Sequence, residues 1–387
     1  MKVLITTDWY QPVVNGVVTS VRILSQELRK RGHEVKILTL SRTCRSYAEQ
    51  DVVYAGSAGA GCIYPEARFR LPVSGKYIRS LMEWKPDIIH SQCEFSTFFL
   101  AKKMAAKLDV PIVHTYHTIY EDYTHYFSPG KTWGKEIVQK ITRKLSSDVS
   151  AMIAPSEKIL KLLEGYQVFC PVSVIPSGID LGAYAGCIRS GCREKVRERY
   201  GISPETTVLL YVGRLAKEKN IEELLRFQRE AQTRGAVLMI AGDGPCRNYL
   251  EKKAGELAVE KSVIFTGMVP PVEIGQYYQA GDLFISGSTS ETQGMTYAEA
   301  LAGGLPLLCR KDACLDGVIE EGKNGWQYRD EEEFLKFLKK WREADGNEKN
   351  RMRRAAREAA GQFSAEEFGR KVEKIYEREK NRRTAAA

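Results

Sequence analysis

The chain has 387 residues, too many for one ordinary hydrophobic core, and its 43% hydrophobic and 28% charged residues are typical of a globular protein with more than one domain. No stretch approaches the ~18 apolar residues of a membrane span, and the nine scattered cysteines lack the spacing of a zinc site, which favours reduced thiols. The net charge is +9, and residues 1–150 hold 21 basic against 14 acidic side chains. Because no nucleic-acid-binding motif accompanies this basic excess, the expected partner is an anionic lipid surface and not a nucleic acid.

The first half of the chain alternates short apolar runs with amphipathic segments. The runs predicted as strands are 2–8, 34–40, 87–92, 111–117, 151–156 and 172–177. Such runs are typical of strands buried on both faces of a parallel sheet. Between the first two, Val17, Val21, Leu24 and Leu28 follow helical spacing and Gly32 provides a stop, which completes a βαβ unit. The first run has no signal peptide ahead of it, so we expect a cytoplasmic protein.

The same alternation of apolar runs and amphipathic segments restarts after a glycine-containing break at 178–193. In the first half, "GSAGAG" (56–61) does not have its glycines in the order of a dinucleotide-binding fingerprint, so it is predicted as a flexible loop. The second set of predicted strands is 207–213, 236–244, 263–267, 282–288 and 305–310. The sequence therefore predicts an α/β protein with two doubly wound, Rossmann-like domains joined near residue 180 and facing one cleft. The charged tail, roughly 331–381, is predicted to be helical, and its last helix to fold back onto the first domain.

Cationic side chains follow one predicted strand of the second domain. Arg214 and Lys219 lie just past the strand 207–213, where open α/β sheets bind ligands. They could hold a diphosphate without a metal, since the chain has no Asp-x-Asp motif. His114 and His117 are predicted on one strand with their rings on opposite faces, so they should not share a metal ion. Taken alone, the two cations could equally be solvated loop residues.

A pair of carboxylates surrounds a predicted helix start after strand 282–288. In "SETQGMTYAEALAGG" (290–304), Glu291 and Glu299 flank Gly294, Met295 and Thr296. Gly294 permits close backbone approach, and the first N–H groups of the helix, those of Met295 and Thr296, could bind phosphate. Glu299 would then reach a ribose and Glu291 a hexose. The alternative is an unrelated loop glutamate and surface glutamate.

These motifs together resemble glycosyltransferase family 4, retaining enzymes with the GT-B fold. Glu-x7-Glu after a strand, "GRLAKEKN" (213–220), "AGDGP" (241–245), "FTGMV" (265–269) and "IPSGIDL" (175–181) occur in family order along essentially the whole chain. The N-terminal motifs "DWYQPVVNGVVTSV" (8–21), "HSQCEFS" (90–96) and "HTYHTIYEDYTHY" (114–126) resemble the bacterial subgroup that glycosylates diacylglycerol. Thr292-Gln293 departs from the Pro-Phe of the wider family and resembles that subgroup.

The resemblance implies a role for each matching residue. It implies that His117, Glu291, Arg214 and Lys219 form the catalytic centre, whereas His117 taken alone could equally be a core histidine. The residues implied to bind the nucleotide sugar are Gly16, Arg214, Lys219, Gly267, Val269, Glu291, Gly294, Met295, Thr296 and Glu299. It further implies an acceptor and membrane-side domain at 1–180 with 366–387, and a donor domain at 181–365. No cofactor and no metal are expected.

The resemblance also implies the reaction. We expect transfer of glucose from UDP-glucose to the 3-hydroxyl of 1,2-diacylglycerol, with retention and without a metal ion. Other acceptors remain open: a glycosyl-diacylglycerol, another lipid, or a soluble acceptor of capsule synthesis. A non-catalytic nucleotide-binding protein is the alternative from another class. The sequence leaves glucose versus galactose, the number of sugars added and the oligomeric state open.

One predicted helix suits a membrane surface. In "KTWGKEIVQKITRKL" (131–145) the apolar residues at helical spacing are Trp133, Ile137, Val138, Ile141 and Leu145, and the basic residues are Lys131, Lys135, Lys140, Arg143 and Lys144. Such a helix can lie on anionic lipid, where each basic residue contributes roughly 1 kcal/mol. We therefore expect a peripheral protein on the inner face of the cell membrane. The alternative is an ordinary helix whose apolar stripe packs on the sheet. A second basic and aromatic patch is expected at 67–79.

Overall fold

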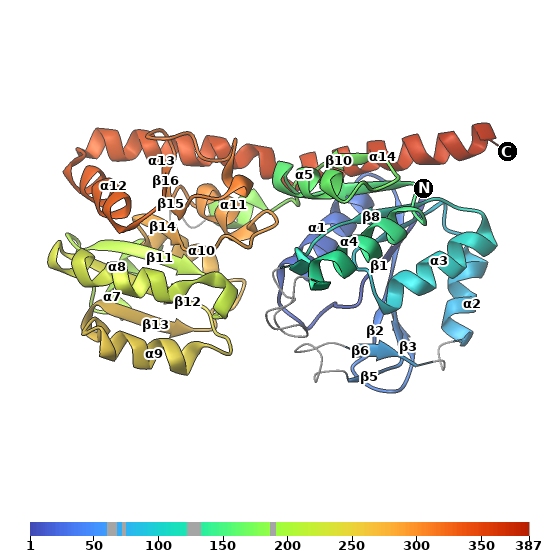
Figure 1. The fold of residues 1–387 in the computed structure, drawn as a ribbon, viewed down its shortest axis with the longest axis horizontal. Coiled ribbons are helices and arrows are strands. Elements are labelled where there is room, and N and C mark those ends of the chain that lie inside the picture. Colours follow the sequence, from blue (N-terminus) through green and yellow to red (C-terminus); the bar gives the residue numbers. More distant parts are fainter. Residues whose placement is uncertain (60–67, 72–74, 122–132, 186–190, 387) are drawn as a thin grey trace. The chain divides into compact units, whose positions relative to one another are not determined.

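The computed structural model describes residues 1–386 except 60–67, 72–74, 122–132 and 186–190. The chain divides into two compact units, Met1–Gly178 with Ala365–Ala387, and Ile179–Ser364 (Figure 1). We call them unit 1 and unit 2. Each contains a largely parallel sheet with helices, which confirms the predicted α/β class with two Rossmann-like domains. None of the helices in the described ranges is long and apolar enough to cross a membrane.

Unit 1 is built on an eight-stranded sheet in the order β10-β9-β8-β7-β1-β2-β4-β3, in which only β3 is antiparallel to its neighbour. Its strands are β1 Lys2–Thr6, β2 Glu34–Leu40, β3 Tyr47–Glu49, β4 Val52–Ala55, β7 Ile88–Ser91, β8 Ile112–Thr115, β9 Ala151–Ala154 and β10 Val172–Val174. All six predicted strands are present. The segment predicted as a loop at 56–61 instead contributes β5 (Ser57–Gly59), which pairs with β6 (Arg68–Arg70), and residues 60 and 61 lie outside the described ranges.

The helices of unit 1 include one from the far end of the chain. They are α1 Gly16–Lys30, α2 Gly75–Trp84, α3 Ser96–Leu108, α4 Trp133–Ser146, α5 Glu157–Gly165 and α14 Ala365–Ala386. The apolar positions of α1 face the core as predicted, and helix α14 packs beside them through Phe368, Val372 and Tyr376. Tyr376 Oη also lies 2.6 Å from His90 Nδ1. The predicted return of the last helix to the first domain is therefore confirmed.

Helix α4 differs from the single apolar stripe that the sequence predicted. Val138 and Leu145 are buried at 7% and 5% exposure, whereas Ile137 and Ile141 are exposed at 39% and 58%. At about 100° per residue, Val138 and Leu145 lie ~20° apart on one side of the apolar stripe, and Ile137 and Ile141 lie ~40° apart on its other side, where basic residues flank them. The side chain of Trp133 lies outside the described part of the chain, as do Lys131 and parts of the predicted 67–79 patch.

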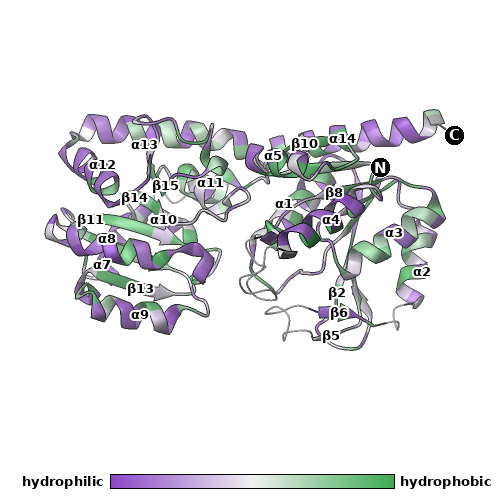
Figure 2. Cartoon of the chain, in the orientation of Figure 1, coloured by the Kyte–Doolittle hydropathy of each residue, from purple (hydrophilic) through white to green (hydrophobic). Residues whose placement is uncertain are grey.

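Unit 2 has a six-stranded, fully parallel sheet in the order β13-β12-β11-β14-β15-β16. Its strands are β11 Thr207–Val212, β12 Ala236–Ala241, β13 Val263–Gly267, β14 Leu283–Ser286, β15 Leu307–Arg310 and β16 Gly325–Tyr328. Its helices are α6 Leu181–Ala185, α7 Cys192–Arg199, α8 Ile221–Thr233, α9 Arg247–Glu256, α10 Ile274–Ala280, α11 Met295–Ala302, α12 Glu331–Glu343 and α13 Gly346–Ala360. Strand β11 is apolar and the outer helix α9 largely polar (Figure 2), as expected for a sheet covered on both faces.

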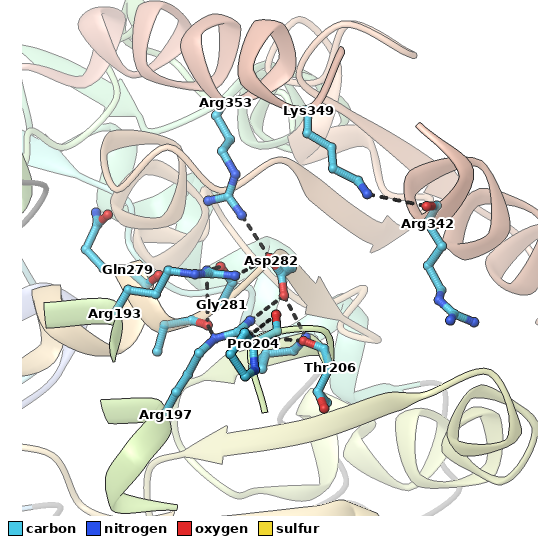
Figure 3. A network of polar contacts seen from close by, with 12 residues as sticks. Arg193, Arg197, Pro204, Thr206, Gln279, Gly281, Asp282, Arg342, Lys349 and Arg353 are labelled. Atoms are coloured by element: carbon cyan, nitrogen blue, oxygen red, sulfur yellow. Dashed lines mark hydrogen bonds and ion pairs between the residues drawn. The ribbon is translucent and has the colours of Figure 1, made fainter. Parts of the chain in front are cut away.

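A carboxylate with three arginines fixes the amino-terminal edge of this sheet (Figure 3). Asp282, directly before β14, accepts hydrogen bonds from Arg193 at 2.7 Å, Arg197 at 2.6 Å and Arg353 at 2.9 Å. Its Oδ2 also accepts from the backbone N–H of Val208 in β11 at 2.9 Å. Burial alone would raise the pKa of Asp282, but Arg193, Arg353 and the other donors outweigh it and lower the pKa. This network joins helices α7 and α13 to the sheet, at the end of the strands opposite the loops that follow β11 and β14.

Candidate active site

The carboxyl edge of the unit 2 sheet brings together the loops that follow β11 and β14, which are neighbouring strands. Lys219, at the end of a short 3-10 helix (Lys217–Lys219), places its Nζ 2.6 Å from Oε1 of Glu291. The Oγ of Ser290 donates to the backbone oxygen of Glu218 at 3.2 Å, and Asn220 donates to Gly287 O at 3.2 Å. The sequence motifs around Lys219 and Glu291 thus form one structural site.

The charges at this site are coupled. Burial alone would lower the pKa of Lys219, but the contact with Glu291 outweighs it and raises the pKa, which keeps Lys219 cationic. Arg214, which is exposed, lies close enough for its charge to oppose that rise. Glu218 adds to the rise, so the two cations lie among two carboxylates, and both cations can donate hydrogen bonds to the oxygens of an anionic ligand.

Helix α11 begins next to this pair. Its N-cap position is Gly294, at φ 73°, and a Cβ there would lie 2.3 Å from the Tyr297 ring, so glycine is required. Gly294 has no side chain with which to cap the helix. The first N–H groups, those of Met295 and Thr296, therefore belong to a helix start that an anion could cap.

Glu299 lies in α11 with its carboxylate held by tyrosines. Tyr278 Oη donates to Glu299 Oε2 at 2.7 Å, and Tyr184 makes a second hydrogen bond with the carboxylate. Burial raises the pKa of Glu299, and these two hydroxyls partly oppose that rise. Glu299 is thus a fixed, partly buried acceptor, and Glu291 is a paired one, so neither is the freely solvated side chain that the alternative reading required.

Glycines let the neighbouring loops approach each other. Gly242 donates its N–H to Gly267 O at 3.0 Å, and a Cβ on Gly242 would lie 1.9 Å from Gly213 O. Gly267 itself has φ 75°. The side chain of Val269 is 8% exposed and packs into the core, so only its backbone is placed to contact a ligand. The nucleotide-binding roles of Gly267 and Val269 stay predictions.

The predicted phosphate contact of unit 1 lies at the start of α1. Asn15 caps this helix, because its Oδ1 accepts from Val18 N at 2.9 Å. Gly16 is the first helical residue and is exposed. The geometry therefore gives Asn15 a structural role and leaves Gly16 at a helix start that a phosphate could approach.

His117 lies after β8 in unit 1, not on the strand as predicted, because β8 ends at Thr115. The alternation of side chains along a strand, from which opposite ring directions were predicted, therefore does not apply to His117. Its Nε2 lies 2.7 Å from Gln92 Oε1, whereas His114 Nε2 lies 3.3 Å from Glu94 Oε1. Burial, followed by the neighbouring His114, lowers the pKa of His117 to about 3, so its ring is neutral at pH 7.

Metal-binding groups do not gather in the part of the chain that the structure describes: no three His, Cys, Asp or Glu side chains are placed to hold an ion. Sequence reasoning missed two partners of the predicted residues, Gln92 and Tyr278. Gln92 could have been found, because it is a polar residue at the carboxyl end of the predicted strand 87–92. Tyr278 gave no such signal, because it lies within α10 and only the packing of α10 against α11 brings it to Glu299.

The chain is similar to known proteins over most of its length. The family model described as Glycosyltransferase Family 4 matches residues 14–183, and that described as Glycosyl transferases group 1 matches residues 192–359. Alpha-monoglucosyldiacylglycerol synthase of Streptococcus pneumoniae is 36% identical over 97% of this chain and 85% of its own. The Acholeplasma laidlawii protein of that name is 34% identical over 87% of each chain.

Solved structures share the fold. HepE from Anabaena, in a complex with UDP and glucose, superposes with a TM-score of 0.75 at 17% identity, over 97% of this chain and 99% of that one. Sucrose-phosphate synthase from Thermosynechococcus elongatus gives a TM-score of 0.77 at 17% identity over 100% of both chains. These neighbours identify the architecture as GT-B.

Proposed function

Because the chain belongs to glycosyltransferase family 4, and so is a sugar-transferring enzyme, we propose that it moves glucose from UDP-glucose to the 3-hydroxyl of 1,2-diacylglycerol with retention of configuration. The observation that carries the proposal is the pairing of Lys219 with Glu291 beside the start of α11, with Arg214 near. This arrangement offers cations for a diphosphate and carboxylates for sugar hydroxyls at one sheet edge. The names of the two relatives support the lipid acceptor.

The proposed reaction exchanges one bond to the sugar for another. The bond between C1 of glucose and the UDP oxygen breaks, and C1 bonds to the acceptor oxygen on the same face. The acceptor proton passes to the departing diphosphate oxygen, so charge balances without a protein nucleophile. Arg214, Lys219 and the N–H groups near Gly16 and Met295 stabilise the negative charge that develops on UDP. Glu291 and His117 bind the transferred sugar, and Glu299 the ribose.

The acceptor requires access to a membrane. Unit 1 carries the basic excess of the chain, and on α4 the exposed Ile137 and Ile141 lie among Lys140, Arg143 and Lys144. Such a surface suits an interfacial helix on anionic lipid. We therefore place the enzyme on the inner face of the cell membrane, in contact with the bilayer through unit 1.

One assay tests donor and acceptor together. Purified protein is incubated with radiolabelled UDP-glucose or UDP-galactose and vesicles of diacylglycerol or monoglucosyl-diacylglycerol in anionic phospholipid, and products are separated by thin-layer chromatography. We expect labelled monoglucosyl-diacylglycerol from UDP-glucose and diacylglycerol. Product from another pair would change the substrate assignment, and no lipid product from any pair would refute the proposal.

Vesicle sedimentation tests the membrane surface separately. We expect Ile141→Asp to weaken binding to anionic vesicles, because it replaces an exposed apolar side chain with a negative charge. Val272→Asp, at an 89% exposed position in unit 2, is the matched control and should bind as the wild type does. Equal binding by all three proteins would exclude α4 as the membrane contact.

A further inference from the structure

Gln92 is fixed at the carboxyl edge of the unit 1 sheet. It directly follows β7 and is 2% exposed. Its backbone N–H donates to Thr6 O in the neighbouring strand β1 at 2.8 Å. Its side-chain oxygen Oε1 lies 2.7 Å from Nε2 of His117. Gln92 is therefore held through its main chain and bonded through its side chain.

This contact determines which ring nitrogen of His117 carries a hydrogen. A carboxamide oxygen only accepts, so Nε2 must donate. The lowered pKa of His117, caused by burial and by His114, leaves the ring with one hydrogen at pH 7. Nδ1 then keeps its lone pair and can accept a hydrogen bond, but it cannot donate one.

The other end of the Gln92 amide supports a role beyond packing. Nε2 of Gln92 is buried and has no hydrogen-bond partner among the described residues. An apolar side chain of similar length would fill the same space without leaving a buried donor unpaired. What glutamine adds here is its oxygen, which is the atom that contacts His117.

We propose that Gln92 is a positioning residue that fixes His117 as the Nε2–H tautomer, so that Nδ1 accepts a hydrogen bond from a hydroxyl of the transferred sugar. The inference rests on the proposed function and adds how His117 is prepared for its ligand. Two ionisable groups lie near the His117 ring: His114 from β8 lowers the pKa of His117, and His117 in turn lowers the pKa of His90 from β7. Glu94 contacts His114. Because these groups also titrate, the kcat of each Gln92 variant is compared with that of the wild type both at pH 7 and over a range of pH.

Two substitutions separate the oxygen from the shape of the side chain. Gln92→Glu places a carboxylate against His117, which raises its pKa and puts a hydrogen on both ring nitrogens. We expect kcat at pH 7 to fall about tenfold, the equivalent of one lost hydrogen bond, and to recover as the pH rises and the imidazolium loses its proton. Gln92→Met keeps the length but removes the acceptor, so kcat should fall about as much without recovery. KM for UDP-glucose should change little in either variant.

A matched control and a spectroscopic readout complete the test. Gln26→Glu introduces the same charge at an exposed position of α1 and should keep wild-type kcat. Nitrogen-15 NMR of the histidine rings reports the tautomer directly, with the His117 signal assigned from its absence in His117→Gln. We expect the Nε2–H form in the wild type, an imidazolium in Gln92→Glu at pH 7, and a tautomer mixture in Gln92→Met.

The outcomes distinguish this inference from the function on which it rests. An Nδ1–H tautomer in the wild type, or wild-type kcat in both Gln92 variants, would overturn the role of Gln92 while glucosyl transfer stands. Transfer by neither wild type nor variants, with every donor and acceptor offered, would overturn both. The expected tautomer together with slower transfer and a pH profile changed only in Gln92→Glu supports the inference.

Discussion

Lys219 Nζ lies 2.6 Å from Glu291 Oε1, although the sequence assigned these residues to different parts of one ligand. The carboxylate keeps the buried amine charged, and the two loops that carry them are held in register at the sheet edge. Because an ammonium group has three N–H donors, Lys219 can bind a diphosphate while it keeps its contact with Glu291. Glu291 would still have acceptor capacity for a sugar hydroxyl, which links binding of the two halves of a nucleotide sugar.

We expect Lys219→Ala and Arg214→Ala each to lower turnover by a factor of ~10² or more, the usual scale for one donor to a developing oxyanion. The measurement is kcat with UDP-glucose and diacylglycerol vesicles. Lys217→Ala, at an exposed position of the same 3-10 helix, is the control and should retain activity. Near-normal turnover in both test variants would exclude this diphosphate clamp.

Removal of divalent ions should leave activity unchanged, because we expect side-chain cations and helix N–H groups to bind the diphosphate. The comparison is the initial rate after dialysis against excess EDTA, with and without added Mg²⁺ or Mn²⁺. A rate that depends on either ion would show that a metal takes part in diphosphate binding.

The Gly294→Ala variant should lose stability and activity. A side chain at φ 73° is strained by about 1–3 kcal/mol, and its Cβ would collide with Tyr297 at 2.3 Å. Thermal unfolding and UDP titration calorimetry measure the two effects. Gly346→Ala, at the start of α13 with no atom within 4 Å of the new Cβ, is the matched control. Equal UDP affinity in both variants would argue against a ligand at the start of α11.

Asp282→Asn should destabilise unit 2 by about 3 kcal/mol or more, because it leaves guanidinium groups without their buried counter-charge. The pKa of Asp282 is lowered by folding, so this contribution is present above the ordinary pKa of 3.8 and is lost as pH falls through the folded-state value. The free energy of unfolding at pH 7, measured with a denaturant, is compared between Asp282→Asn and Asp316→Asn, an exposed control in the same unit. A similar small change in both would refute the role of the network.

Most strands within apolar runs were predictable, even the three-residue edge strand β10, whereas β3, β4, β5, β6 and β16 were missed. Runs such as 207–213 are rich in β-branched and apolar residues, and they appear as β11 and its neighbours. Strand β16, with the sequence GWQY, and the three-residue strands β3, β5 and β6 are too short to show a period, so only their pairing partners define them. Helix α4 was placed correctly, but which apolar side chains it buries depends on the sheet it packs against.

The proposed site residues were recognisable as sequence motifs, but their contacts were not. Arg214, Lys219, Glu291 and Glu299 follow strand ends or open a helix, which is a local signal. Lys219 with Glu291 spans 72 positions and His117 with Gln92 spans 25, so no local pattern reports these contacts. The nucleotide and sugar roles of the individual residues remain predictions for the experiments above.

Helix α14 belongs to unit 1 but follows unit 2 in the chain. During synthesis, residues 1–178 therefore leave the ribosome before Phe368, Val372 and Tyr376 exist to cover the apolar surface beside α1. At about 5–20 residues per second, translation of residues 179–364 leaves that surface bare for roughly 10–40 s. We therefore expect chaperones that bind exposed apolar segments to bind the nascent residues 1–178. Unit 2 is one continuous range of the chain, so it can fold as soon as that range has left the ribosome.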